Sequence, residues 1–542
     1  MATCAATDKP SKPGMDALMP MKSTVKRHLL LAALPLLLLM CALPPTAPVS
    51  ETVIPTPTPV DLDWLFTPAP GGGIGGADSP AGGAPTQETA TTPQVVPPPT
   101  LSADAPPILY YTQAGDTLPV VAVRFGVLPQ EITSPQPLPQ EGLLPPGQLL
   151  IIPAHLGATT DDFHLLPDSE FVYSPSAVDF DVSAYVQQAG GYLSEYREWL
   201  QSTGWTSGAD IVARVALENS VNPRLLLALL EYRSGWVFGQ PKSKTQRSYP
   251  LGYVNQDADG LYHQLVWAVN QLSIGYYGWR EGRLTALAFA DGRLARLAPS
   301  LNAGTVALQY FFSLDSSEAD WKAAVDPQTG FIATHERMFG DLWLRARAVE
   351  PLYPPDLQQP PLILPFLRGQ LWGFTGGPHG AWERDGAWAA IDFAPGSVEP
   401  GCAPTINWVT ASAPGLVVRS ERGVVVIDLD GDGHEQTGWA LLYLHIAEKG
   451  RVPLGTWVET GDKIGQPSCE GGHATGTHVH FARKYNGEWI AADGPVPFVL
   501  SGWRVHAGHA PYLGNMTRDG ESVLASPLGT YETRITRTAD DP

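Results

Sequence analysis

Two histidines placed two residues apart, His478 and His480, are the strongest sign of chemistry in this chain of 542 residues. They belong to the short run Gly-Thr-His-Val-His-Phe at positions 476–481. Because alternate side chains of a β-strand point to the same face, both imidazoles are expected to project into one cleft. Imidazole binds zinc and also transfers protons near neutral pH. The motif therefore predicts a metal-dependent hydrolytic site.

Further groups of the same kind occur upstream. His445 ends the run Tyr-Leu-His at 443–445, and Asp392 lies within Ala-Ile-Asp-Phe-Ala-Pro at 390–395. Zinc in a hydrolytic site takes three protein ligands and keeps one position open for water. Imidazoles that do not bind the metal can then handle protons. Three histidines and one aspartate on three strands can thus supply the parts of such a site.

The elements that must position these residues are short and β-branched from about residue 360 onward. We expect strands over Trp408–Ala411, Gly415–Arg419, Val424–Leu429 and Trp439–His445. Between two of them, the acidic run Asp-Leu-Asp-Gly-Asp-Gly at 428–433 is similar to a calcium loop. Its twelfth position is Trp439, where such a loop needs a bidentate glutamate, so a plain hairpin turn is favoured.

Taken together, these motifs resemble the lysostaphin and LytM family of peptidoglycan endopeptidases over about residues 370–495. The matching runs are Ile-Asp-Phe-Ala-Pro at 391–395, Ala-Pro-Gly at 413–415, Tyr-Leu-His at 443–445, Gly-Asp at 461–462 and Thr-His-Val-His-Phe at 477–481. The resemblance implies a C-terminal antiparallel β-sheet metallopeptidase domain, which we place at 365–500, followed by an extension at 501–542. It also implies a bound Zn2+ and a cross-link peptide as the substrate.

The same resemblance assigns roles to individual residues. Asp392 and His480 would be zinc ligands, and His445 and His478 would be the catalytic imidazoles that orient or deprotonate the water. The family places its first histidine four residues before the aspartate, but that position is Trp388 here. We therefore expect His379, thirteen residues before Asp392, to complete the metal site, with the polar segment Glu383–Gly386 looped out.

If His379 does not bind metal, the sequence has a second interpretation. The chain would then be a catalytically degenerate cell-wall-binding protein that scaffolds or activates other wall hydrolases.

A compact unit is expected at residues 108–154. It combines the strands Leu109–Gln113 and Leu149–Ile152 with a helix over Leu118–Phe125 and a second short helix near Pro129–Thr133. Its two ends, Tyr-Thr-Gln-Ala-Gly-Asp-Thr-Leu at 111–118 and Pro-Gly-Gln-Leu-Leu-Ile-Ile-Pro at 146–153, resemble the LysM domain. That resemblance implies a βααβ module that binds glycans containing N-acetylglucosamine.

Within the LysM-like unit, the resemblance places the glycan-binding residues at Gly115, Asp116 and Thr117. The alternative is a module of the same fold that has lost its ligand.

Residues 178–352 are expected to form an all-α domain, with helices over Ala209–Asn219, Pro223–Tyr232, Leu261–Tyr277 and Ala303–Leu314. The run from Val221 to Trp236 resembles the catalytic helix of lysozyme-like lytic transglycosylases. In that family a glutamic acid protonates the glycosidic oxygen. Arg233 stands at that place here, and an arginine cannot donate its proton near neutral pH. We therefore expect a degenerate, non-catalytic lysozyme-like domain that is glycan-binding or structural.

An export signal region is expected at 1–43, because Lys22, Lys26 and Arg27 precede the apolar run Leu29–Leu43. That run is short for a membrane span, which needs about 20 apolar residues. Residues 44–107 are rich in Pro, Thr and Gly and are expected to be a disordered linker. The remaining chain would then be extracytoplasmic, secreted or anchored at the cell envelope through its N-terminal region alone.

The net charge argues against one class of partner, and the cysteines are informative about the cellular compartment. The chain has 34 Lys and Arg against 54 Asp and Glu, a formal net charge of -20, which argues against nucleic acid as a partner. Of its four cysteines, Cys402 and Cys469 fall in the C-terminal domain without CxxC spacing. Outside the cytoplasm they are expected to form a disulfide, and two buried free thiols are the alternative.

Overall fold

In this computed structural model of the chain, residues 105–396, 399, 401–538 and 541 are described. The expected export signal and nearly all of the expected linker lie outside the described residues. Among the helices that are described, none combines the length and the apolar character that crossing a membrane requires.

The N-terminal module consists of β1 (Ile108–Tyr111), α1 (Leu118–Phe125), the short 3₁₀ helix η2 (Pro129–Glu131) and β2 (Leu149–Ile152). The two strands pair antiparallel, with Ile108 opposite Ile152. Helix α1 begins where the Thr117 hydroxyl accepts a hydrogen bond from the backbone N–H of Val120, and it ends at Gly126 in the left-handed conformation. The order and type of these elements agree with the sequence-based expectation.

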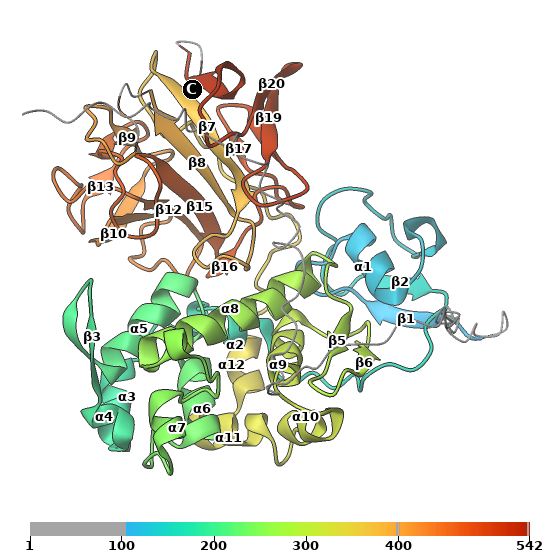
Figure 1. The fold of residues 1–542 in the computed structure, drawn as a ribbon. Helices are drawn as coiled ribbons and strands as arrows, with labels where there is room; N and C mark the ends of the chain where they lie inside the picture. The colour runs from blue at the N-terminus through green and yellow to red at the C-terminus, as the bar shows by residue number, and fades with distance from the viewer. Residues whose placement is uncertain (1–104, 397–398, 400, 539–540, 542) are drawn as a thin grey trace, which may run out of the picture. The chain divides into compact units, whose positions relative to one another are not determined.

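Residues 164–354 are mainly helical, and Figure 1 shows these helices in green to yellow. Their bounds are α2 Asp168–Phe171, α3 Val182–Ala189, α4 Tyr192–Glu195, α5 Gly208–Asn219, α6 Pro223–Ser234, α7 Lys244–Ser248, α8 Leu261–Arg280, α9 Ala303–Ser313, α10 Glu318–Ala324, α11 Phe331–Phe339 and α12 Leu342–Val349. The expectation of an all-α domain needs a correction, because two small hairpins are present. They pair β3 (Arg197–Leu200) with β4 (Gly204–Ser207), and β5 (Ala286–Ala288) with β6 (Leu294–Arg296). Each is too short to give a clear alternating pattern in the sequence.

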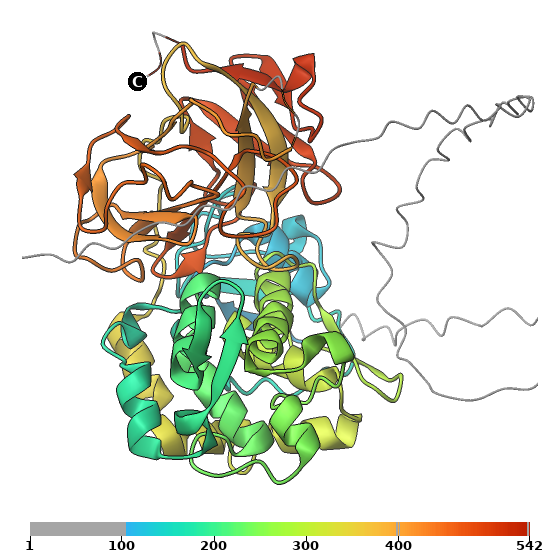
Figure 2. The same ribbon diagram turned by 60° about the vertical axis from the view of Figure 1, so that its left-hand side comes forward.

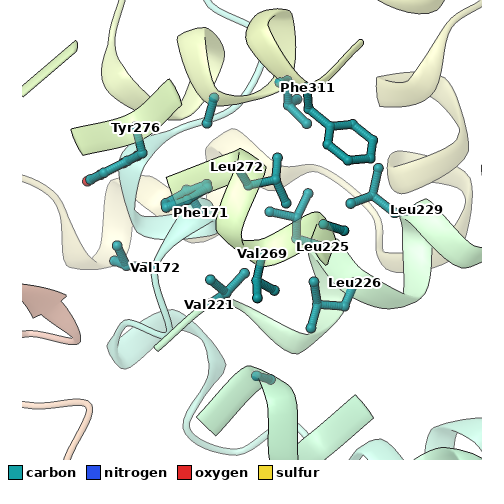
Figure 3. Close-up of a cluster of buried hydrophobic side chains, with 14 of the residues drawn as sticks. Phe171, Val172, Val221, Leu225, Leu226, Leu229, Val269, Leu272, Tyr276 and Phe311 are labelled. Carbon is teal, nitrogen blue, oxygen red and sulfur yellow. The ribbon is translucent and has the colours of Figure 1, made fainter. Parts of the chain in front are cut away.

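Helix α6 lies in the centre of this helical region. Leu225 to Leu230 are all fully buried, so the helix is apolar around its whole circumference rather than along one stripe. Figure 3 shows side chains from α6 and α8 meeting around Phe171, whose ring stacks on Tyr276 with ring centroids 4.2 Å apart. Burying one such leucine contributes about 1.5–3 kcal/mol, so this cluster is a large part of the stability of the region.

The structure gives Arg233 and Glu231, near the end of α6, internal roles. Arg233 pairs with Asp315 at 2.9 Å and lies over the ring of Phe312. The Glu231 carboxylate accepts hydrogen bonds from the backbone N–H groups of Val237 and Phe238. Neither side chain is arranged as a proton donor, and the absence of glycosidase chemistry from this region stays a prediction.

The C-terminal part is built on a nine-stranded sheet in which the strands β13, β10, β11, β12, β15, β8, β7 and β21 are neighbours in that order and β16 pairs with β15. The bounds are β7 Leu371–His379, β8 Ala390–Pro395, β10 Gly415–Glu421, β11 Val424–Asp428, β12 Trp439–Leu444, β13 Trp457–Val458, β15 Val479–Tyr485, β16 Glu488–Trp489 and β21 Arg534–Thr536. Every pairing is antiparallel. These strands run in the golden yellow to red part of the ribbon in Figures 1 and 2.

Two smaller sheets accompany it. Strands β9 (Val409–Thr410) and β14 (Lys463–Gly465) pair with each other, and β17 (Val499–Leu500), β18 (Trp503–Ala507), β19 (Gly514–Arg518) and β20 (Glu521–Leu524) form a four-stranded sheet.

The two faces of the large sheet enter different cores. Along β15, Phe481 packs into the core of the C-terminal domain, whereas Ala482 joins the cluster of the helical region. The same alternation separates Ile391 from Ala390 on β8. His480 lies two residues before Ala482 on β15, so its side chain projects from the same face, the one that packs against the helical region.

The segment after residue 500, expected as an extension, is part of this fold. Ile535 of β21 pairs with Trp372 of β7, and both are almost fully buried. Met516 of β19 belongs to the same core. Without β21 the outer edge of β7 would be an unpaired sheet edge, which folded proteins avoid. The domain boundary therefore lies beyond the residue 500 expected from the sequence.

Candidate metal centre

Three adjacent strands bring one aspartate and two histidines together. His480 of β15 pairs directly with Asp392 of β8, and their Nδ1 and Oδ1 atoms lie 3.3 Å apart. His379 ends β7, and its Nε2 lies 3.4 Å from the same Asp392 oxygen and 3.0 Å from Nδ1 of His480. The sequence-based expectation that His379 approaches Asp392 therefore agrees with this geometry.

Irregular pairing between β7 and β8 replaces the four-residue spacing of the family. Gly376 lies opposite Asp392 and His379 lies opposite Ala390, with shifts of register on both sides of Gly376. His379 thus reaches the site because β7 pairs with β8 in the sheet, and not because it lies four residues before Asp392 in the chain. Residues 380–389 form the connection, and the segment Glu383–Gly386 lies in this loop as expected.

Backbone carbonyls fix the orientation of both imidazoles. His379 Nδ1 lies 2.8 Å from the Gly377 oxygen, and His480 Nε2 lies 2.9 Å from the Ala381 oxygen. A carbonyl oxygen can only accept, so these nitrogens carry hydrogen, and when the rings are neutral the opposite nitrogens carry lone pairs. Both lone pairs therefore face the carboxylate of Asp392, an arrangement that is typical of metal-binding histidines.

The carboxylate of Asp392 is buried, and one of its two oxygens has an unused hydrogen-bonding capacity. Oδ1 of Asp392 is inaccessible to solvent and lacks a hydrogen-bond partner among the described residues. Burial opposes its ionisation, but the positive charge that His379 carries when it is protonated outweighs burial and holds the pKa of Asp392 well below its usual value. One anionic oxygen and two imidazole lone pairs within 4.8 Å of one another fit a divalent cation. Two histidines, one carboxylate and an open side are the ligand set of a hydrolytic zinc site.

A second histidine pair lines the open side. His478 Nε2 lies 3.9 Å from Asp392 Oδ1, and the rings of His445 and His478 are 4.4 Å apart between centroids. Carbonyl oxygens of Glu470 and Gly476 hold the Nδ1 atoms of His445 and His478, at 2.8 and 2.7 Å. Burial, and then His478, lowers the pKa of His445 to about 3, so His445 is neutral at physiological pH.

A disulfide joins Cys402 and Cys469, so this prediction is confirmed. Cys469 precedes Glu470, whose carbonyl orients His445. On the other side, the Gly401 carbonyl accepts a hydrogen bond from the backbone N–H of Thr477, next to His478. The bridge therefore connects the two loops that hold the second histidine pair.

These residues share a cleft of about 480 Å3. Its lining is formed by Thr375, His379, Asp392, Ala394, His445, His473 to His478, His480, Tyr512 and Pro527. The sequence did not single out Tyr512, whose ring stacks on His379 with centroids 4.1 Å apart. It lies in the segment expected as an extension, and no local pattern links it to the histidines. Burial, and then the charge of Asp392, raises the pKa of Tyr512, which favours the neutral, hydrogen-donating phenol.

The acidic turn between β11 and β12 differs from this centre. The oxygens of Asp428, Asp430 and Asp432 come close to one another, but Asp430 and Asp432 are exposed. The two carboxylate oxygens of Asp428 accept hydrogen bonds from the backbone of Asp430 and Gly433. Trp439 begins strand β12. A hairpin turn accounts for all of these contacts, as the sequence analysis favoured.

In the N-terminal module, the residues expected to bind glycan are buried. Asp116 is fully enclosed and accepts hydrogen bonds from the Tyr110 hydroxyl at 2.6 Å and from Arg124 at 2.7 Å. Thr117 caps α1, and Gly115 packs closely against the guanidinium of Arg280. The structure thus gives Gly115, Asp116 and Thr117 internal roles, and their part in glycan binding stays a prediction.

Comparison with known proteins found one family model and several proteases to which this chain is similar. The family model "LasA, N-terminal domain" matches residues 164–354, the helical region. "Protease LasA" of Pseudomonas aeruginosa is 28% identical over 365 residues, which cover 64% of this chain and 79% of the relative. "Beta-lytic metalloendopeptidase" of Achromobacter lyticus is 29% identical over 164 residues, covering 29% of this chain and 41% of the relative. The chain is similar to these two relatives at under 30% identity.

This similarity supports the prediction of a metalloendopeptidase. The alignment with LasA is longer than the expected peptidase domain of 365–500, so it reaches into the helical region as well. Among solved structures, "A Novel M23 Metalloprotease Pseudoalterin from Deep-sea" matches with a TM-score of 0.26 and 23% identity, covering 31% of this chain and 96% of that one. For the helical region, the matching family model is the LasA type, and the resemblance to lytic transglycosylases stays a prediction.

Proposed function

We propose that this chain is an exported zinc endopeptidase that cleaves the peptide cross-links of bacterial peptidoglycan. The observation that carries the proposal is the buried Asp392 oxygen between the lone pairs of His379 and His480, at the edge of an open cleft. The proposed substrate rests on the resemblance of motifs at 391–481 to the lysostaphin type and on the similarity to LasA.

In this proposal His379, Asp392 and His480 hold the zinc ion. The ion supplies a Lewis acid that lowers the pKa of a water molecule and polarises the scissile carbonyl. The Nδ1 of His445 is committed to the Glu470 carbonyl, so its Nε2 would be the atom that accepts a proton in the cleft. His478 stabilises the negative charge that develops on the substrate oxygen, and the phenol of Tyr512 lies at the same cleft.

The remaining regions fit an envelope location. The disulfide between Cys402 and Cys469 is typical of oxidising compartments. In the proposal, the export signal at 1–43 and the linker at 44–107 carry the enzyme out of the cytoplasm, and the LysM-like module at 108–154 holds it near glycan strands. Tethering to the polymer raises the local concentration of substrate around the cleft.

The test combines metal analysis with digestion of purified sacculi. The full chain should contain about one zinc per molecule and should release free amino groups from sacculi without releasing reducing sugar ends. His379→Ala should lose both zinc and activity, whereas His434→Ala, on the exposed acidic turn, should keep both. Wild-type protein that binds zinc but releases no amino groups would exclude the proposed substrate.

Absence of zinc from wild type and from His379→Ala alike would favour the second interpretation, a wall-binding scaffold without catalysis.

A further inference from the structure

We propose that helix α8 of the helical region positions the metal centre, through the loop 380–389 and the side chain of Asn270. This inference rests on the proposed function only in assuming that the centre binds zinc. It assigns the helical region a part in building the site, beyond covering one face of the sheet.

The loop contributes directly to the metal centre. It starts after His379 and leads into the strand that carries Asp392, so both of its ends are attached to expected ligands. Between them, the Ala381 carbonyl fixes His480 through the 2.9 Å contact to Nε2. A displacement of Ala381 would therefore release the imidazole that presents Nδ1 to the centre. Partners of this kind affect metal affinity about 10–100-fold in other proteins.

Few contacts within the loop itself hold Ala381 in place. Its backbone N–H donates to the Ala387 carbonyl at 3.1 Å, which closes the loop into a tight arch. The segment from Gly380 to Ala389 contains no helix or strand. A connection with so little internal hydrogen bonding depends on its surroundings for a single conformation.

Those surroundings are supplied by α8. The side chain of Asn270 donates to Oδ2 of Asp385 at 3.1 Å and accepts from the backbone N–H of Asp385 at 3.2 Å. The next residue, Gly386, packs against Ser273. A Cβ atom added at Gly386 would lie 3.4 Å from the Cβ of Ser273. Asn270 and Ser273 are three residues apart on the helix and so present one surface to the loop.

Other contacts of the loop point to the same region. Ala381, Ala387 and Ala389 are buried in the hydrophobic cluster that contains the core of the helical region. Glu383 lies near Asn219 and Glu218, at the end of α5. The loop is therefore held by the helical region on one side and holds His480 on the other.

The experiment measures zinc affinity by chelator competition in the full chain, comparing Asn270→Ala with Asn255→Ala. Asn255 is an exposed asparagine of the same region whose side chain caps a short helix away from the loop. We expect Asn270→Ala to weaken zinc binding by roughly 3–10-fold, somewhat less than direct partners of a ligand do. Alanine favours helix more than asparagine does, so α8 should remain folded. Asn255→Ala should bind zinc as wild type does.

Hydrogen exchange provides a second readout that a general loss of stability would not reproduce. Asn270→Ala should speed amide exchange selectively in 380–389, and Asp385→Ala should give a similar change. The double variant should then lose little more affinity than either single one, because both act on the same contact.

Equal zinc affinity in wild type and Asn270→Ala would overturn the proposal, as would independent, additive effects of the two substitutions. A wild-type chain that binds zinc but leaves sacculi intact would refute the proposed substrate while leaving this coupling unaffected.

Discussion

The two faces of the nine-stranded sheet differ in composition although they alternate along the same strands. On one face, Ile391, Phe393, Tyr443 and Phe481 are completely buried among other apolar residues of the C-terminal domain. The opposite face carries Asp392 and His480 at one end and continues in small or aliphatic residues that join the helical region. The large buried aromatic side chains thus lie on one face, and the polar groups of the candidate site lie on the other.

A sheet covered on both sides can hold a rigid site without placing polar groups in its main core. The register of β8 and β15 fixes the distance between Asp392 and His480, and the packing of Phe481 behind them fixes the register. Functional sites on strands are more precisely held than sites on loops. The comparison predicts that substitutions on the two faces have separable effects.

The largest effect is expected on the polar face. His379→Ala removes one of the three proposed ligands, and activity should fall by at least about 10³-fold, or roughly 4 kcal/mol of transition-state stabilisation. Peptidase assays on a soluble cross-link peptide, together with zinc analysis, measure this. Retained zinc and activity would show that another residue occupies the position assigned to His379.

On the apolar face, Phe481→Ala should destabilise the fold by about 3–5 kcal/mol, because it opens a cavity in a fully buried core. Urea denaturation gives the loss of unfolding free energy. The fraction that remains folded should still contain zinc, since the side chain points away from the ligands. Loss of zinc from folded protein would mean that the two faces are not separable.

A smaller effect is expected for the disulfide, which connects loops at the rim of the polar face. Cys402→Ser combined with Cys469→Ser should cost about 2–4 kcal/mol of stability for a bridge that closes 67 residues. Because the bridge holds the Glu470 and Gly401 carbonyls, kcat should also fall, with zinc content unchanged. An unaltered kcat would restrict the bridge to a purely stabilising role.

The smallest expected effect is a change of stability with pH that arises from Glu383, in the loop between β7 and β8. Burial, and then Glu218, raises the pKa of Glu383 to about 7. Its folded pKa lies above the unfolded value, so the wild type should lose about 1–3 kcal/mol of stability as pH rises from about 4.5 to 7.

Glu383→Gln should remove this loss and make the protein more stable than wild type at pH 8, with little difference at pH 4.5. Unfolding free energies at both pH values test this, with the exposed Glu448→Gln as control. A loss of stability for Glu383→Gln at pH 8 would contradict the assigned protonation.

Much of the candidate site could be predicted from the sequence because its signals are local. Spacing of two residues on a strand places His478 and His480 on one face whatever the rest of the fold does. The strands around Val424 and Trp439 and the helices at Pro223 and Leu261 depend on patterns of this kind. The pairing of Cys402 with Cys469 is expected instead from an oxidising compartment. The resemblance to known families supplied the roles of Asp392 and His445.

What the tertiary structure decided depends on residues far apart in the chain. His379 reaches Asp392 only through irregular pairing of β7 with β8, and Tyr512 reaches His379 from a segment expected to lie outside the domain. The burial of Asp116 and the contact of Asn270 with Asp385 likewise depend on how helices and strands pack. Periodicity specifies which face a side chain takes, whereas register and packing, set by long-range contacts, determine what it meets there.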